Sequence, residues 1–502
     1  MKAVILAAGV GSRLRPMTNK KPKTLVQVNN KAMLGHIIDA LSINGIKDIV
    51  ICTGFESCQI VNYCQNNYPM LNFVFVENVD YEDTNNMYSL YLARDFLDDD
   101  ILLMNADLVF DSGVIKGLMI ECGTSVAVDV GRYLEESMKV IVDSGVIRNI
   151  SKKISKKEAY GCSIDVYKVC RDDVKSLVLE MEKIINEQND RNQWTEVMLD
   201  NLFSSGLVSA RPFDIQKMKW YEIDNYDDLA SAEVLFNDRI ESLKNKKIFF
   251  IDRDGTLTLG NEVLPGVMDF LKYLKNTRKK FFIATNNSSL TPAEHLERFN
   301  KLGLDLKEEN VLVSSSSAIS FFHVKGFKKV FWMANTNVSS FFEESGLVYE
   351  EVNPQAVLLT YDTEITYQKL RICVDLIRKG VPYYATHSDI VCPTAKGSIP
   401  DIGTFIKVIE MTTGILPNKV FGKPDKSFID PILEKYGLTH EDAVIVGDRL
   451  YTDIKLAENS DITSVLVLTG ETKRDDYEDS EIKADVIVLN LLFLMAHDKE
   501  FV

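Results

Sequence analysis

The stretch FFIDRDGTLT occupies residues 249–258 and decides how this chain has to be divided. An apolar run leads into two aspartates, a glycine and a threonine, a pattern typical of a buried strand that opens a domain. In an extended segment the side chains of residues i and i+2 share a face, so Asp252 and Asp254 point the same way. The chain has already begun once in this manner, with MKAVILAAGVGSRL at its first residues. We therefore expect two successive domains, each opening on a buried strand.

The composition is that of a folded protein with more than one core. The chain has 502 residues, of which 46% are hydrophobic and 26% are charged. At about 150 residues per domain, this length predicts two to four domains. The net charge of −16 argues against a nucleic-acid partner, because such proteins present basic patches, although a local basic pocket for phosphates is still compatible with it.

The first residues have two interpretations. MKAVILAAGV resembles a signal peptide, but a glycine-rich turn interrupts the apolar run and cations follow at once, which favours a buried strand. No segment reaches the ~18 apolar residues of a membrane span, so we expect no membrane partner. The eight cysteines form no C-x-x-C pair, so a zinc site is not expected. Reduced, mostly buried cysteines predict a cytoplasmic protein.

Short apolar runs alternate with amphipathic stretches along both halves of the chain. In the first half, KAVILAAG, KDIVICTG, LNFVFVEN and DILLMNADLVF predict strands, and MLGHIIDALSING and NMYSLYLARDFL predict helices. The second half repeats the alternation from KIFFIDRDG onward, after the polar stretch VLFNDRIESLKNKK, which places a boundary near residue 244. Such alternation predicts α/β domains with a parallel sheet covered on both faces.

A glycine-rich turn follows the first predicted strand. In LAAGVGSRL (residues 6–14), Gly9 and Gly11 allow backbone N–H groups to approach a phosphate. Arg13 supplies a cation with a forked donor, and Lys23 follows in PKTLVQV. Two cations after a glycine turn suit a triphosphate, although Lys23 taken alone is equally compatible with a solvated surface lysine.

Two aspartates complete a candidate magnesium site in the first half. Asp107, in NADLVF, ends a buried strand, where ligands bind in open parallel sheets, and Asp224 follows a short strand in WYEIDNYDDL. Paired carboxylates can hold Mg²⁺ between phosphate oxygens. Each aspartate has a structural alternative as a helix or turn cap.

Residues 1–236 resemble the nucleotidyltransferases that include sugar-phosphate nucleotidylyltransferases and bacterial phosphocholine cytidylyltransferases. LAAGVGSRL and the following PK carry the resemblance to the superfamily, and DTNNMYSLYLA (residues 83–93) and WYEIDNYDDL are most similar to the phosphocholine branch. One departure is the sequence Asn105-Ala106-Asp107, where many relatives have Gly-Asp. The resemblance implies that a substrate phosphate attacks the α-phosphorus of CTP with Mg²⁺ and releases pyrophosphate.

The resemblance also implies roles for individual residues. Arg13 would hold the triphosphate, Lys23 would bridge the reacting phosphates, and Asp107 and Asp224 would hold Mg²⁺. The nucleotide-binding set comprises Leu6, Ala8, Gly9, Gly11, Arg13, Lys23, Thr84 and Asn85, and Asn86 would bind substrate.

The phosphorylated substrate is left open by the sequence. A trimethylammonium group would favour an aromatic cage, to which Tyr160, Trp194 and Tyr221 could contribute, although these aromatics are equally compatible with the core. Phosphoethanolamine, a glycerol phosphate, another polyol phosphate or a phosphonate are alternatives to phosphocholine. A sugar-1-phosphate transferase that uses UTP or dTTP is a further alternative.

The second half supplies further polar groups at strand ends, in a fixed order behind Asp252 and Asp254. Thr285 and Asn286 follow the strand in KFFIATNNSS, Lys423 lies in VFGKPDKSF, and Asp448 and Asp453 follow the strand in AVIVGDRLYTDI. One aspartate can attack phosphorus while the other protonates the leaving oxygen. The order predicts a phosphoryl-transfer site with donors, a cation and metal-binding carboxylates.

Residues 246–495 resemble the haloacid-dehalogenase-type phosphatases through this motif set. Asp252 to Thr285 is 33 positions (285 − 252), too short for a large cap, whereas Thr285 to Lys423 is 138 positions (423 − 285), enough for an α/β cap. With DRDGTLTLGNEVLPG and the GKP segment, the pattern is most similar to the NagD-like branch. The resemblance implies two doubly wound α/β domains: a nucleotidyltransferase domain over 1–240, then a phosphatase core over 246–324 and 411–502 with a C2-type cap inserted at 325–410.

Roles for the second site follow from the same resemblance. Asp252 would become an aspartyl phosphate, Asp254 would be the general acid and base, and Thr285 and Lys423 would stabilise the transferring phosphoryl group. Mg²⁺ would be held by Asp252, Asp448 and the backbone carbonyl of Asp254, supported by Asp453, and Asn286 would contact substrate.

The fusion predicts a bifunctional enzyme acting on small phosphoesters and a nucleoside triphosphate. A transferase with a non-catalytic phosphatase-like scaffold is the alternative, against which the complete motif set argues. A CDP-linked product would suit a surface glycan, teichoic acid or lipid, and the oligomeric state is left open.

Overall fold

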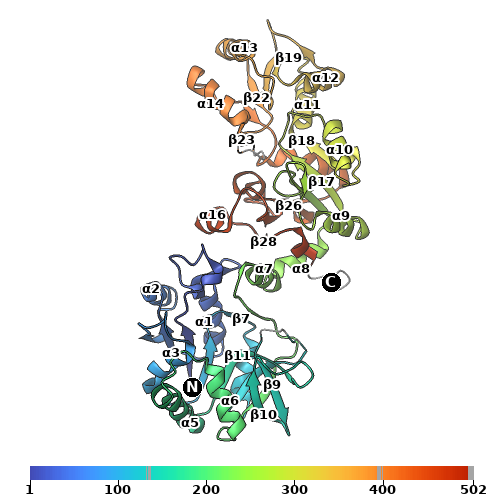
Figure 1. Cartoon of the computed structure of the whole chain (residues 1–502). Helices are drawn as coiled ribbons and strands as arrows, with labels where there is room; N and C mark the ends of the chain where they lie inside the picture. Colours follow the sequence, from blue (N-terminus) through green and yellow to red (C-terminus); the bar gives the residue numbers. More distant parts are fainter. Residues whose placement is uncertain (132, 134–136, 393–396, 398, 496–502) are drawn as a thin grey trace. The chain divides into compact units, whose positions relative to one another are not determined.

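The computed structural model of this chain describes residues 1–131, 133, 137–392, 397 and 399–495, and it consists of two compact units. Unit 1 is Met1–Phe236 and unit 2 is Asn237–Val502 (Figure 1). The division falls inside the polar stretch VLFNDRIESLKNKK, at which the sequence analysis placed a domain boundary.

Unit 1 alternates strands and helices. Its strands are β1 (Lys2–Ala7), β2 (Gln27–Val28), β3 (Lys31–Ala32), β4 (Asp48–Thr53), β5 (Asn72–Glu77), β6 (Ile101–Asn105), β7 (Leu108–Phe110), β8 (Ser125–Asp129), β9 (Lys139–Asp143), β10 (Val146–Ser151), β11 (Gly161–Val169), β12 (Arg211–Asp214) and β13 (Trp220–Glu222). Its α-helices are α1 (Met33–Ile43), α2 (Ser57–Asn67), α3 (Asn86–Leu92), α4 (Gly113–Ile120), α5 (Arg171–Glu182), α6 (Thr195–Ser205) and α7 (Tyr226–Leu235).

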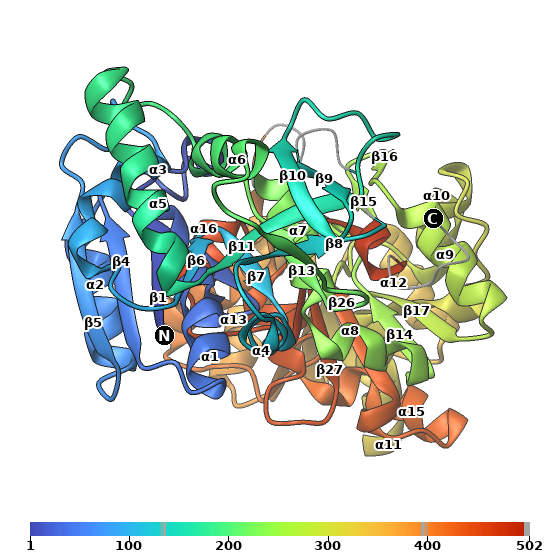
Figure 2. The same ribbon diagram turned by 90° about the horizontal axis from the view of Figure 1, so that it is seen from below.

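The main sheet of unit 1 is mixed, in the order β10-β9-β11-β6-β1-β4-β5, with β8 pairing β11 and β12. The strands predicted from the sequence, β1, β4, β5 and β6, are parallel and lie side by side (Figure 2). The prediction of a wholly parallel sheet is wrong beyond β6, because β11 runs antiparallel to β6, β8 and β9. Among the described residues, no α-helix lies between β8 and β11, whereas parallel strands are usually joined by a helical crossover.

Both faces of this sheet are buried, as predicted. Along β1, Ala3, Ile5 and Ala7 pack into one apolar cluster with α1 and α4, and Val4 and Leu6 pack into another with α3, α5 and α6. The alternation follows from the period of two along a strand. The carboxyl ends of β1 and β6 are thereby fixed next to each other, where the candidate site begins.

The structure also bears on the membrane and cysteine predictions. Within the part of the chain that is described, no helix is long and apolar enough to cross a membrane. All the cysteines are free thiols, but the expectation that most are buried is wrong. Cys58 and Cys122 are exposed and Cys170 and Cys392 are half-buried, because these residues lie at element ends and loops rather than on sheet faces.

Unit 2 again alternates strands and helices. Its strands are β14 (Ile248–Ile251), β15 (Thr258–Leu259), β16 (Glu262–Val263), β17 (Lys280–Thr285), β18 (Val311–Val313), β19 (Lys329–Met333), β20 (Val348–Tyr349), β21 (Ala356–Leu359), β22 (Tyr383–Ala385), β23 (Val391–Cys392), β24 (Ile399–Pro400), β25 (Lys419–Val420), β26 (Ala443–Gly447), β27 (Thr463–Val467) and β28 (Val486–Val488). Its α-helices are α8 (Asp238–Ser242), α9 (Val267–Asn276), α10 (Pro292–Lys301), α11 (Ser314–Lys325), α12 (Thr336–Glu344), α13 (Tyr367–Arg378), α14 (Ile402–Thr413), α15 (Asp430–Tyr436) and α16 (Arg474–Asp479).

Unit 2 is built on two parallel sheets. The core sheet has the order β18-β17-β14-β26-β27-β28, and the second sheet has the order β20-β19-β21-β22-β25 and is inserted between β18 and β26 (Figure 1). The second sheet forms the cap domain, with apolar clusters on both of its faces. Because β25 belongs to it, the cap sheet continues to Val420, beyond residue 410, where the sequence analysis placed its end.

The strand carrying FFIDRDG lies inside the core sheet, with β17 on one side and β26 on the other. All residues of β14 are buried, as the apolar run predicts. The ends of these three strands therefore bring together side chains from residues 252, 285 and 448, which are far apart in the sequence.

Candidate active sites

The glycine turn after β1 is shaped for close backbone approach. Gly11 has a φ of +67°, and a Cβ on it would strike the side chain of Lys23 at 2.6 Å. A Cβ on Gly9 would meet nothing within 4 Å, so its backbone faces open space. The turn then leads into the short helix Ser12–Leu14, which carries Arg13. This geometry leaves room for a phosphate beside Gly9, and it packs the Lys23 side chain against Gly11.

Lys23 connects the two predicted metal carboxylates. Its Nζ lies 2.7 Å from Asp107 Oδ2 and 2.6 Å from Asp224 Oδ1. Burial by itself would lower the pKa of Lys23, but the attraction of Asp107 and Asp224 outweighs it and raises that pKa above its ordinary value. Arg13, whose side chain is exposed, lies 3.0 Å from the other oxygen of Asp224. The structure thus brings together Arg13, Lys23, Asp107 and Asp224, as the sequence predicts.

Glu222 joins these carboxylates and was not foreseen from the sequence. Oxygen atoms of Asp107, Glu222 and Asp224 lie within 4.8 Å of one another. Burial, and then repulsion from Asp107, Asp165 and Asp224, raises the pKa of Glu222 to about 8. Asp107 Oδ1 is buried without a hydrogen-bond partner among the described residues. Oxygen donors with an unsatisfied carboxylate atom fit a hard divalent cation such as Mg²⁺.

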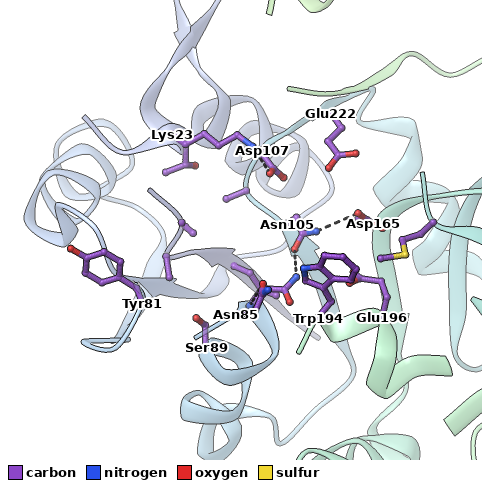
Figure 3. A pocket seen from close by; sticks show the side chains of 18 of the residues that line it. Lys23, Tyr81, Asn85, Ser89, Asn105, Asp107, Asp165, Trp194, Glu196 and Glu222 are labelled. Carbon is purple, nitrogen blue, oxygen red and sulfur yellow. Dashed lines mark hydrogen bonds and ion pairs between the residues drawn. The ribbon is translucent and has the colours of Figure 1, made fainter. Parts of the chain in front are cut away.

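These groups open into a pocket of about 270 Å³ that lies at the carboxyl ends of β1 and β6 (Figure 3). The lining includes the following predicted nucleotide or substrate residues: Leu6, Ala8, Gly9, Lys23, Thr84, Asn85, Asn86, Asp107 and Trp194. Gly11, Arg13, Asp224, Tyr160 and Tyr221 lie outside that lining. Tyr221 packs beside the apolar cluster of Leu14 and Val109, so the structure does not assemble the three-aromatic cage.

The far end of the pocket is acidic. Figure 3 shows Asp165 and Glu196 near Trp194, and Glu222 nearer to Asp107. Tyr167 Oη donates to Asp165 Oδ1 at 2.8 Å and contacts Glu196 Oε1 at 3.1 Å. Burial, and then repulsion from Glu196, raises the pKa of Asp165 to about 8, and burial also raises the pKa of Glu196. Asp165, Glu196 and Glu222, of which Glu196 is buried and the other two are half-buried, repel one another in one cavity, so a bound cation would relieve their repulsion.

A backbone irregularity aims Asp165 into this cavity. Its φ is +56°, in the left-handed region, and the register between β11 and β8 shifts there between Ser163 and Tyr167. Asn105 Nδ2 donates to Asp165 Oδ2 at 3.3 Å. Asn105 belongs to the Asn105-Ala106-Asp107 segment that departs from the Gly-Asp of many relatives, and its amide connects the strand end of β6 to Asp165.

The sequence analysis missed four charged residues of this pocket. Glu222 lies two positions before Asp224 and shares its face in the extended WYEID segment, a signal that could have identified it. Asp165, Glu196 and Lys152 come from a bulged strand, a helix and a loop without any local motif. Lys152 Nζ lies 4.9 Å from the centre of the Trp194 ring.

In unit 2, the strand ends assemble the second candidate site. Asp252 follows β14, Thr285 ends β17 and Asp448 follows β26, and all three are buried. Gly255 has a φ of +87°, and a Cβ on it would lie 2.4 Å from Asp448 Oδ2. Because the glycine of the DRDGT segment has no Cβ, the Asp448 carboxylate can lie directly beside the turn.

Lys423 lies at the centre of this site and is fully enclosed. Its Nζ contacts the Asp252 carboxylate and lies 2.6 Å from Asp453 Oδ1. Burial alone would lower the pKa of Lys423, but Asp252 and Asp453 raise it above its ordinary value. Asn286 accepts from the Lys423 backbone N–H at 2.9 Å and donates to its carbonyl at 3.1 Å.

Carboxylates in this site also fit a metal ion. Oxygen atoms of Asp252, Asp448 and Asp453 lie within 4.8 Å of one another, and all three residues are buried. Burial, and then repulsion from Asp252 and Asp453, raises the pKa of Asp448 well above its ordinary value. Such mutual repulsion in a buried set is what a divalent cation relieves. The Asp254 side chain lies outside this cluster and contacts Arg253 instead.

The cap closes the site with groups that the sequence analysis did not identify. Asp389 Oδ2 accepts from Arg449 Nη1 at 3.1 Å, and Asp389 Oδ1 accepts from Asn286 at 3.2 Å. Asp389 and Asp401 lie on either side of the buried His387, each 3.6 Å from a ring nitrogen. Burial lowers the pKa of His387 to about 4, which keeps it neutral. The polar end of PYYATHSD was the signal available in the sequence.

Comparison with known proteins identifies both units. Residues 2–119 match the nucleotidyl transferase family, residues 249–348 match the haloacid dehalogenase-like hydrolase family, and residues 420–493 match a second HAD-hydrolase-like family. The acid sugar phosphatase of Staphylococcus haemolyticus is 30% identical over 241 residues, which are 48% of this chain and 91% of that protein. The 5'-nucleotidase YutF of Bacillus subtilis is 30% identical over 240 residues, which are 47% of this chain and 93% of that protein.

A solved structure is similar to the same part of the chain. The 4-nitrophenylphosphatase of Thermotoga maritima is 39% identical and covers 50% of this chain and 97% of its own, with a TM-score of 0.49.

Proposed function

This chain belongs through its C-terminal unit to the haloacid dehalogenase-like hydrolases, in their NagD-type phosphatase branch, and carries a nucleotidyl transferase domain at its N-terminus; we propose that it is a bifunctional enzyme. Unit 2 hydrolyses a small phosphomonoester, and unit 1 transfers a cytidylyl group from CTP to a small phosphorylated alcohol. The observation that carries the proposal is that each unit has its own lysine bridging two aspartates, one of which follows a strand paired in parallel: Asp107 follows β6 in unit 1, and Asp252 follows β14 in unit 2.

In unit 2, Asp252 is the nucleophile. Its carboxylate oxygen attacks phosphorus while the bond to the leaving oxygen breaks, and Asp254 gives that oxygen a proton. Water then attacks the phosphorus and releases phosphate from Asp252, and its proton returns to Asp254. Lys423 and Thr285 neutralise and position the transferring phosphoryl group, because both lie at the nucleophile.

Asp252, Asp448 and the backbone carbonyl of Asp254 would hold Mg²⁺ in unit 2, with Asp453 in support. The ion supplies charge neutralisation for the phosphoryl oxygens when it is bound. Lys423 contacts both Asp252 and Asp453, and Arg449 adds a second positive charge near them.

The phosphatase substrate is small, with a hydrogen-bonding leaving group. The pocket is lined by Asp389 and Asp401 of the cap and by Arg449 of the core, which contacts Asp389. Charged and polar groups of this kind bind hydroxyls rather than an apolar chain. A sugar or polyol phosphate fits this wall, in accord with the sugar-phosphate activity named for the Staphylococcus haemolyticus relative.

In unit 1, a phosphate oxygen of the substrate attacks the α-phosphorus of the nucleotide, and the bond to the β-phosphate oxygen breaks to release pyrophosphate. Gly9 and Arg13 bind the triphosphate, and Lys23 contacts the reacting phosphates. Asp107 and Asp224, with Glu222, would hold Mg²⁺, which neutralises charge on the phosphates. Lys152, which lines the same pocket, would hold the phosphate of the substrate.

A cationic alcohol is the substrate class favoured by the acidic end of the pocket. Asp165, Glu196 and Glu222 have raised pKa values because burial and mutual repulsion disfavour their charges. An alkylammonium group would restore the charge balance there, and the Trp194 face would attract it. Phosphocholine and phosphoethanolamine are the substrates of this class.

A polyol phosphate is the second candidate for unit 1. Asn78, Ser89, Asn105 and Ser163 line the same cavity and offer amide and hydroxyl partners for several hydroxyl groups. Carboxyl groups with raised pKa values can donate to such hydroxyls while they are neutral. The charge of the preferred substrate decides between the two candidates.

The deciding experiment is a pyrophosphate-release screen in the Asp252→Asn background. That substitution removes the nucleophile of unit 2, so the candidate phosphoesters are not consumed during the assay. CTP, UTP, dTTP and ATP are each tested with phosphocholine, phosphoethanolamine, glycerol phosphate, glucitol phosphate and glucose 1-phosphate. Preference for CTP with an amino-alcohol phosphate supports the proposal, and preference for UTP or dTTP with the sugar phosphate refutes the cytidylyl assignment.

Phosphate release from 4-nitrophenyl phosphate by the unsubstituted chain tests the second activity. Loss of that release in Asp252→Asn supports the phosphatase assignment. Absence of release in the unsubstituted chain, across the same phosphoester panel, would favour the scaffold alternative.

A further inference from the structure

Arg253, the residue between the two aspartates of the DRDGT segment, holds the side chain of its neighbour. Its Nε lies 2.9 Å and its Nη2 2.5 Å from the same oxygen, Asp254 Oδ2. A charge-assisted contact through two donors is among the stronger and more directional hydrogen-bonding arrangements. The Arg253 side chain is only 12% exposed, so water competes weakly for its guanidinium.

The remaining arm of Arg253 is fixed by a buried histidine. Nη1 donates to His295 Nδ1 at 3.0 Å, and His295 Nε2 donates to the Asn287 carbonyl at 2.9 Å. Because a carbonyl can only accept, the Nε2 atom carries the ring proton and Nδ1 is left as the acceptor for Arg253. Burial, and then the charge of Arg253, lowers the pKa of His295 to about 3, so the ring is neutral and can accept.

Helix α10 holds the histidine in register. Thr291 and Glu294 form a capping box at its start, with Pro292 in the first turn, and His295 stacks on Phe299 at 6.1 Å between ring centres. The helix start, the imidazole and the guanidinium thus form a continuous support that ends on Asp254.

The two oxygens of Asp254 are consequently not equivalent. Both contacts from Arg253 fall on Oδ2, whereas Oδ1 has no hydrogen bond from any residue that the structure describes. Asp254 lines the site pocket together with Cys392 and Asp401 of the cap, on the side where the proposed mechanism needs the leaving group. Oδ2 is therefore held by Arg253, and Oδ1 is left available for proton transfer to the leaving group.

We infer that Arg253 and His295 are positioning residues for proton transfer to the leaving group: His295 fixes the guanidinium, and the guanidinium orients the Asp254 carboxyl group with one oxygen toward the scissile bond. The inference rests on the proposed phosphatase function of unit 2. Neither residue needs to touch the phosphoryl group, because Lys423 and Thr285 already occupy that position.

The test exploits the fact that proton donation matters most for basic leaving groups. Phenyl phosphate and 4-nitrophenyl phosphate have nearly the same shape but leave as phenolates of different basicity, and glycerol phosphate leaves as a still more basic alkoxide. The value of kcat/KM reports phosphoryl transfer to Asp252, so the later hydrolysis step does not enter. Arg253→Met, which keeps the apolar stem, is compared with the unsubstituted chain on all three esters.

We expect Arg253→Met to lower kcat/KM at least 10-fold more on glycerol phosphate than on 4-nitrophenyl phosphate, with phenyl phosphate between them. His295→Phe, which preserves the packing on Phe299, should also lower kcat/KM more on glycerol phosphate than on 4-nitrophenyl phosphate, but by a smaller factor. Arg253→Lys should restore part of the loss, since it returns the charge without the fork. Arg298→Met on the exposed face of α10 is the matched control and should leave the ratio unchanged.

An equal loss on all three esters in Arg253→Met would overturn the inference, because a purely structural defect lowers every rate alike. A ratio of kcat/KM between glycerol phosphate and 4-nitrophenyl phosphate that is unchanged because neither value falls would overturn it as well. Failure of the unsubstituted chain to hydrolyse any ester would instead refute the phosphatase function, so the two failures are distinguishable. Thermal unfolding of each variant identifies substitutions that unfold unit 2, and in that case Arg253→Gln, which is smaller and neutral, carries the comparison.

Discussion

Asn286 and Lys423 hold each other by reciprocal hydrogen bonds: the Lys423 N–H donates to Asn286 Oδ1 at 2.9 Å, and Asn286 Nδ2 donates to the Lys423 carbonyl at 3.1 Å. The same amide also donates to Asp389 of the cap at 3.2 Å. Asn286, which the sequence analysis placed among substrate-binding residues, thus has its amide committed to the loop that carries the catalytic lysine. Its position sets where the Lys423 ammonium meets Asp252.

Asn286→Ala should therefore impair phosphoryl transfer through the displaced Lys423, because Asn286 holds the loop that carries this lysine. The substitution leaves the buried N–H and carbonyl of Lys423 unsatisfied, which costs about 1–3 kcal/mol for each group. We expect kcat/KM for 4-nitrophenyl phosphate to fall at least 10-fold and unit 2 to lose thermal stability. Ser320→Ala, on the exposed face of α11, is a control that should change neither quantity. Full activity in Asn286→Ala would show that the loop holds Lys423 without this clamp.

The sequence predicts most of the fold and the centre of each site. Apolar runs such as KAVILAAG and KFFIATNN become buried parallel strands, because burial on both faces demands such runs. Polar residues at the ends of such strands meet within each unit, Asp252 and Thr285 in unit 2 and Asp107 beside the end of β1 in unit 1, because parallel strands end at one edge of a sheet. These features depend on local pattern and on one general rule of α/β folds.

The outer parts of both sites depend on contacts that no local pattern specifies. Asp165 reaches its pocket through a bulge in an antiparallel strand, and Glu196 reaches it from the first turn of α6. Asp389 reaches the core only because the cap folds over it, and its partner Arg449 is adjacent in sequence to Asp448 yet serves the cap. Such groups are fixed by tertiary packing, so their roles emerge only when the elements are assembled.

The two activities should be separable by single substitutions. Lys23→Met removes the cation that bridges Asp107 and Asp224, whereas Asp252→Asn removes the nucleophile of unit 2. Charge stabilisation of this kind is commonly worth about 10²-fold or more in rate. We expect Lys23→Met to abolish pyrophosphate release and spare phosphate release from 4-nitrophenyl phosphate, and Asp252→Asn to do the reverse. Loss of both activities in either variant, with both units still folded by circular dichroism, would contradict two independent sites.

Magnesium should stabilise unit 2 through Asp448. Its pKa is raised well above the ordinary value by burial and by repulsion from Asp252 and Asp453, so the metal-free cluster is strained electrostatically. A ligand present at about 100 times its Kd stabilises a fold by about 2.7 kcal/mol, which at about 2–4 °C per kcal/mol raises Tm by about 5–11 °C in a domain of this size. Differential scanning calorimetry with and without Mg²⁺ should show this shift.

Asp448→Asn provides the contrast for the magnesium experiment. It keeps the shape, removes one buried negative charge and weakens the ion site. We expect the metal-free variant to unfold at a higher temperature than the unsubstituted chain, the Mg²⁺-dependent shift of unit 2 to shrink, and phosphatase activity to be lost. A Mg²⁺-dependent Tm shift of undiminished size in Asp448→Asn would mean that the ion binds elsewhere.

Asp165 should make the stability of unit 1 depend on pH and should also govern its substrate choice. Its folded pKa of about 8 lies above its ordinary value, because burial and Glu196 disfavour its charge. A carboxyl group whose pKa rises on folding stabilises the fold fully below its unfolded pKa, and that contribution declines as pH rises from about 4 through about 8. Without ligand, the Tm of unit 1 should therefore fall over this range, and Asp165→Asn should flatten the decline.

The same variant discriminates between the candidate substrates of unit 1. If the acidic end binds an alkylammonium, Asp165→Asn removes a charge partner and should raise KM for phosphocholine at least 10-fold at pH 8, where the carboxyl group is substantially ionised. It should change KM for glycerol phosphate much less, because an amide still pairs with hydroxyls. Trp194→Leu, which removes the aromatic face but keeps an apolar side chain, should weaken phosphocholine binding in the same direction. A larger loss on glycerol phosphate than on phosphocholine would reassign this end of the pocket to a polyol, since the carboxyl group would then act as a hydrogen-bond donor rather than as a charge.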